Sequence, residues 1–130
     1  MADLRFNDKN NQKKEISVFA SGIVATSDTM DDILFTLPEA SLVTSAYVVV
    51  LTASGVLTSA LDIKVGATIV ADEVAVDATG VQAGTQGMAY FPTGGIVTVT
   101  AGAVAPDTAG SIKVIVEYIE TKLSEGTYTD

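Results

Sequence analysis

Apolar and polar residues alternate along most of this chain with the two-residue period of a β-strand. The segment ISVFASGIV, from Ile16 to Val24, predicts a first strand that is interrupted at Gly22. A second strand, ILFTL (33–37), stops at Pro38, which cannot donate to a sheet ladder. The segment LVTSAYVVVLTAS (42–54) is apolar on both faces, as expected of a central strand that is covered on two sides.

The second half of the chain continues this pattern. Residues 61–74, LDIKVGATIVADEV, predict a hairpin with a two-residue turn at Gly66 and Ala67, and residues 77–87 have the composition of a loop. Three further strands are predicted at 88–93, 94–104 and 109–122, and no segment sustains a helical period. About eight short strands with regular turns predict an all-β fold, a single β-sandwich or jelly-roll-like domain over residues 15–123. An extended arm (1–14) and a tail (124–130) flank it.

The last predicted strand, SIKVIVEYIE (Ser111–Glu120), has two different faces. One face is plainly core: Ile112, Val114, Val116 and Tyr118. The other mixes two charges with two isoleucines: Lys113, Ile115, Glu117 and Ile119. This mixed face predicts a subunit interface. In the competing interpretation it lies against the second sheet of the same chain, with both charged residues at the margin.

Composition supports a β-fold and excludes much chemistry. The chain has 17 Val, 9 Ile and 16 Thr, together 42 of 130 residues, which favours β-sheet. It has no cysteine and no histidine, so disulfides, Cys or His zinc sites and Ser-His or Cys-His nucleophiles are absent. The apolar run AYVVVL is far too short to span a bilayer. The N-terminus is not expected to be a secretory signal, because no apolar segment follows its charges.

Charge divides the chain into two parts. Residues 1–14 hold four basic and two acidic side chains, net +2, whereas residues 15–130 hold three lysines and 14 acids, net −11; together they give −9. We expect no nucleic acid and no membrane as partners of the acidic body, because such surfaces would repel it. The basic arm is expected to bind an acidic protein surface.

Three groups of residues are candidates for catalysis or ligand binding. The adjacent carboxylates Asp31-Asp32 and Asp72-Glu73 should point to opposite faces of a strand, so they are interpreted as solvated acids and not as catalytic pairs. The segment SDTMDD (27–32) has oxygen ligands at a spacing that could hold calcium, but it lacks the central glycine and the terminal glutamate of a hand-type loop, so a calcium site is not favoured. Tyr90-Phe91 could form an exposed aromatic edge, although core packing is favoured. No cofactor and no enzymatic activity are expected.

The polar arm, the hairpin LDIKVGATIVADEV and the segment GGIVTVTAGAVAPDTAG leading into SIKVIVEYIE resemble the capsid decoration, or cement, proteins of tailed bacteriophages. The resemblance implies a compact β-fold, a homotrimer or other small cyclic oligomer, and attachment to the outer surface of an icosahedral head. The protein would be made in the host cytoplasm and would clamp neighbouring major capsid subunits. The arm residues implied to contact the capsid are Leu4, Arg5, Phe6, Lys9, Lys13 and Lys14. The alternative is a head-fibre base or a receptor- or carbohydrate-binding module.

Overall fold

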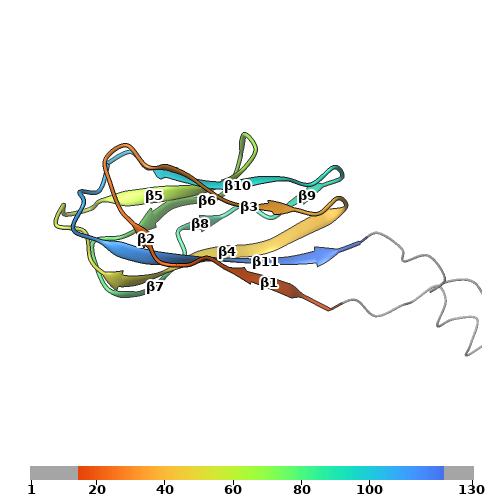
Figure 1. Cartoon of the computed structure of the whole chain (residues 1–130), viewed down its shortest axis with the longest axis horizontal. Coiled ribbons are helices and arrows are strands. Elements are labelled where there is room, and N and C mark those ends of the chain that lie inside the picture. The colour runs from red at the N-terminus through yellow and green to blue at the C-terminus, as the bar shows by residue number, and fades with distance from the viewer. Residues whose placement is uncertain (1–14, 122–130) are drawn as a thin grey trace, which may run out of the picture.

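Two antiparallel sheets packed face to face form the molecule (Figure 1). The computed structural model describes residues 15–121, so the predicted arm with its six residues and the predicted tail (124–130) lie outside the described residues. Sheet A contains β1 (Ser17–Ala20), β2 (Val24–Ala25), β4 (Ser41–Thr52), β7 (Gly80–Gln82), β9 (Ala89–Phe91) and β11 (Ser111–Glu120). Sheet B contains β3 (Asp31–Leu37), β5 (Ala60–Val65), β6 (Thr68–Ala75), β8 (Thr85–Gln86) and β10 (Gly95–Ala101). The predicted all-β sandwich is therefore confirmed.

Most of the long strands lie where the sequence predicts them. The strand β4 lies inside sheet A, between β11 on one side and the short strands β7 and β9 on the other. The hairpin β5–β6 turns at Gly66, whose φ of 60° is a conformation that glycine adopts without strain. Residues 15–121 include no helix that is long and apolar enough to cross a membrane.

The predicted interruption of the first strand at Gly22 is confirmed, whereas one predicted loop differs from the structure. The first strand is divided into β1 and β2, because the backbone leaves the ladder at Ser21. There the Ser21 backbone N–H donates to the Val114 carbonyl (2.9 Å), and the Val114 N–H donates to the Ser21 hydroxyl oxygen (2.8 Å). The predicted loop 77–87 holds β7 and β8, which pair with β4 and β6.

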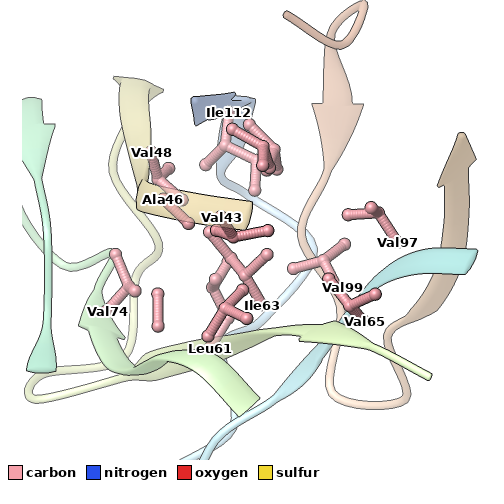
Figure 2. Close-up of a cluster of buried hydrophobic side chains, with 14 of the residues drawn as sticks. Val43, Ala46, Val48, Leu61, Ile63, Val65, Val74, Val97, Val99 and Ile112 are labelled. Carbon is pink, nitrogen blue, oxygen red and sulfur yellow. The ribbon is translucent and has the colours of Figure 1, made fainter. Parts of the chain in front are cut away.

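The core lies between the two sheets and consists mainly of valine, leucine and isoleucine (Figure 2). Ile112, Val114 and Val116 of β11 are fully buried, and Tyr118 packs against the edge of this core. The prediction for the inner face of the last strand is therefore confirmed. Figure 2 shows Val43, Ala46 and Val48 of β4 above Leu61 and Ile63 of β5. Branched side chains fill such a layer well.

Side chains also join the two sheets along both sides of the sandwich. On one side Phe19 of β1 stacks on Phe35 of β3, with ring centroids 3.5 Å apart. On the other side Gln86 belongs to β8 of sheet B, but its side-chain amide bonds to the backbone of Ala46 in β4. These links hold sheet A in a defined position against sheet B, with its outer face turned away.

Candidate functional site

The four residues predicted as a subunit interface lie on the outer face of β11, pointing away from sheet B. Ile115, Glu117 and Ile119 are half-buried and Lys113 is exposed. The competing interpretation, in which this face packs on the second sheet of the same chain, is wrong, because the opposite face of β11 forms that contact.

Strand register shows which residues surround these four. Ile115 lies opposite Ala20 of β1 and Tyr47 of β4, and Ile119 lies opposite Leu42 of β4. The same alternation continues across β7 and β9. We call the resulting surface the sheet A face; its residues are Val18, Ala20, Leu42, Ser45, Tyr47, Val49, Leu51, Val81, Tyr90, Lys113, Ile115, Glu117 and Ile119.

Large apolar side chains of the sheet A face are open to solvent. Val18 is 59%, Val81 67% and Tyr90 51% exposed. These three residues come from three different short strands, so sequence reasoning missed Val18 and Val81 and named Tyr90 only as part of a possible aromatic edge, whereas the outward residues of β4 were signalled by its apolar pattern on both faces. A contiguous apolar face of this kind marks an interaction surface.

The outer face of sheet B is different in one respect. It also exposes Ile33, Ile69 and Ile96, but each of them lies opposite a threonine or a lysine. On the sheet A face three pairs join two apolar residues, Val49–Val81, Leu42–Tyr90 and Ile115–Tyr47. Val18 lies opposite Glu117, and Val49 also lies opposite Lys113. Sheet A therefore offers apolar cross-strand pairs that these three isoleucines of sheet B lack.

Glu117 is the one acidic residue of the sheet A face, and its carboxylate is already hydrogen-bonded. The Ser45 hydroxyl donates to Oε1 (3.0 Å) and the Tyr47 hydroxyl donates to Oε2 (3.1 Å). The hydrogen bond to Glu117 is the main cause that raises the pKa of Tyr47, with burial and the carboxylate charge adding to it. Tyr47 thus remains a donor, and a partner could cover Glu117 without leaving its carboxylate unsatisfied.

The carboxylates of Asp62, Asp72 and Glu73 converge, with ligand atoms within 4.8 Å of one another. The expectation that Asp72 and Glu73 point to opposite faces is therefore wrong. Glu73 has a φ of 53° where the β5–β6 register shifts, so strand alternation fails there. A hydrogen bond with Asp62 is the main cause that raises the pKa of Asp72. Asp72 and Glu73 are exposed, so the cluster does not form the deep pocket that carboxylate catalysis would need.

The remaining candidates are separated by the structure. Within residues 15–121 the acids of the 27–32 segment form no group of three potential metal ligands. Phe91 packs against the core, as favoured, whereas Tyr90 is half-exposed on the sheet A face. The two aromatic residues therefore do not make a joint platform.

Comparison with known proteins shows that the fold is similar to that of a chain in a solved phage capsid structure. No protein-family model and no curated protein matches the chain. A chain in the structure "Cyanophage Pam1 capsid asymmetric unit" is similar over 84% of this chain and 87% of its own length, with a TM-score of 0.60 and 16% identity. A chain in "Acidic stable capsid structure of Helicobacter pylori bacteriophage KHP30" is similar over 82% and 93%, with a TM-score of 0.47 and 14% identity. The first of these similarities shows a shared fold.

Proposed function

We propose that this protein is a structural component of a phage virion that decorates the outside of an icosahedral head and stabilises it by clamping neighbouring major capsid subunits. The observation that carries the proposal is the exposed apolar sheet A face on the outside of the sandwich. The fold shared with a chain of the cyanophage Pam1 capsid structure supports it. The role is not enzymatic.

Two parts of the chain would have separate tasks. The sheet A face would contact a neighbouring subunit, either a second copy of this protein or the capsid protein, through apolar burial, which supplies binding free energy. The arm would use its basic residues, net +2 over residues 1–14, to steer and orient the protein on an acidic shell. A protein that binds only the assembled shell stabilises the shell by mass action.

Co-sedimentation with mature heads tests the proposal. The protein is expected to sediment with heads to a saturating ratio and to raise the temperature at which they release DNA. Free coat protein, which lacks the assembled lattice, is the matched control and should not bind. Failure to bind heads, or equal binding to free coat protein, would contradict the proposal.

The alternative, a receptor- or carbohydrate-binding module, rests on a single half-exposed residue, Tyr90, because Phe91 packs against the core. Sugar binding normally uses an aromatic face together with convergent polar groups. A glycan-array measurement with Tyr90→Ala as the control would detect such a role. The decoration role rests on the whole sheet A face, to which Tyr90 contributes one residue.

A further inference from the structure

We propose that the sheet A face binds the same face of a second copy, the two copies being related by a two-fold axis that crosses β11 at Ile115. This inference names the partner of the surface used in the proposed function and rests on that function for its biological role. The contact itself requires no head, so the two ideas can fail separately.

Charge singles out this face for contact between identical chains. Residues 15–130 carry a net charge of −11, so two copies repel each other over most of their surfaces. The sheet A face holds one positive and one negative side chain, Lys113 and Glu117, and is neutral. A second copy therefore meets the least repulsion, and the most apolar surface, at this face.

The positions of the two charges fit a two-fold axis. Lys113 and Glu117 each lie two residues from Ile115, on opposite sides of it and about 7 Å away. This stretch is regular, because Lys113, Ile115 and Glu117 pair without a shift with Val49, Tyr47 and Ser45. Rotation about an axis across the strand at Ile115 brings Lys113 of each copy opposite Glu117 of the other. The face thus forms two complementary ion pairs with its own copy.

The same rotation matches the apolar ends of the face. A row here is a set of outward residues that lie side by side on neighbouring strands. The row of Ile119 and Leu42 is the second one from the axis on one side. Leu51, which is 44% exposed, is in the second row on the other side. Each copy therefore places its Ile119–Leu42 row over the other copy's Leu51. A face that binds itself in this way closes at two copies, which is a small cyclic oligomer but not the trimer that the resemblance implies.

The size of the face sets the expected affinity. Five rows about 7 Å apart on four strands about 4.8 Å apart cover roughly 650 Å² per copy. A pair would then bury about 1,300 Å², towards the lower end of the range for specific interfaces. We therefore expect a dimer in the micromolar range, formed before the protein meets a head.

Charge exchange followed by sedimentation equilibrium of the full chain tests the inference. Lys113→Glu alone should weaken the dimer by about thirtyfold or more, because two attractive pairs become two repulsive ones. Glu117→Lys should do the same, and the double exchange Lys113→Glu/Glu117→Lys should recover most of the affinity. Lys64→Glu, on the outer face of sheet B, adds the same negative charge away from the interface and should change affinity less than about threefold. Thermal unfolding of every variant confirms that it is folded.

Mixing the two single variants gives the most specific result. In a mixed pair, the glutamate introduced at position 113 of one chain faces the lysine introduced at position 117 of the other, while the unchanged Glu117 and Lys113 also meet, so both attractive contacts return. The mixture should therefore form heterodimers, whereas neither variant pairs well with itself. Three results would overturn the two-fold contact. The wild-type chain could stay monomeric up to about 100 μM, roughly a hundredfold above the expected Kd. The mixture could dimerise no more tightly than either single variant alone, or the wild-type chain could form a trimer. Attachment to heads would remain a separate measurement.

Discussion

Replacing Ile115 and Ile119 together by lysine should abolish assembly and leave the fold intact. Both side chains are half-buried on the outer face of β11, so a partner removes only part of each from water. The loss of apolar burial is about 1 kcal/mol per isoleucine, roughly half the value for complete burial. A two-fold pair contains four such positions, so the variant loses about 4 kcal/mol, or roughly a thousandfold in Kd. Desolvation of the new ammonium groups adds to this loss.

The fold should tolerate the change, because lysine can lay its stem along the sheet and keep its charge in water. Circular dichroism and sedimentation on one purified sample should show a folded monomer, and the variant should not bind heads. Ile112→Lys is the matched control: it is on the same strand but fully buried, so it should unfold the domain. If the double variant also lost its β-signal, the face would be part of the core; if it still formed dimers and bound heads, the face would not be an interface.

Three further results are expected. Deleting residues 1–14 should leave the melting temperature of the domain nearly unchanged but weaken binding to heads in a salt-dependent way; wild-type occupancy by the truncated chain would contradict the proposed arm. Gly94→Ala should destabilise by about 2 kcal/mol or more in urea unfolding, because Gly94 has a φ of 72° and a Cβ would meet the Leu37 carbonyl oxygen; Gly22→Ala, with open space around it, should be nearly neutral. Asp107→Ala should lower the melting temperature at pH 7. The backbone N–H groups of Gly55 and then Ala109 donate to the Asp107 carboxylate and lower its pKa in the folded protein. The stabilisation is therefore present above pH 3.8, the pKa of an unperturbed aspartate, and disappears as the pH falls through the lower pKa of the folded state. The difference from wild type should therefore shrink in acid, and a pH-independent difference would refute this account.

The two faces of β11 could be predicted from the sequence because strand alternation is a local property. Ten consecutive residues keep the period without a break, so Ile112 and Ile115 are assigned to opposite faces by counting alone. What covers the outer face depends on which strands lie beside β11. That neighbourhood is set by pairings between residues far apart in the chain, such as Ala20 with Ile115, and alternation does not encode them.

Local departures from regular structure explain the errors. Glycine-rich residues 77–87 have loop composition, yet β7 forms there because β4 offers an unpaired edge, and Gly80 adopts a φ of 109° that other residues would resist. The acids Asp72 and Glu73 lie at a bulge, where the two-residue period no longer applies.

The side-chain amide of Gln86 has a consequence for how the protein behaves in concentrated solution. Between β7 and β9 the backbone of Ala46 is open, and Gln86 closes it by accepting from the Ala46 N–H (2.8 Å) and donating to its carbonyl (2.7 Å). A side chain thus takes the place of a missing strand segment, and an incoming chain finds no free ladder there. At this position sheet A can then gain a neighbour by stacking but not by strand addition, so one possible start of fibre growth is closed within the chain itself.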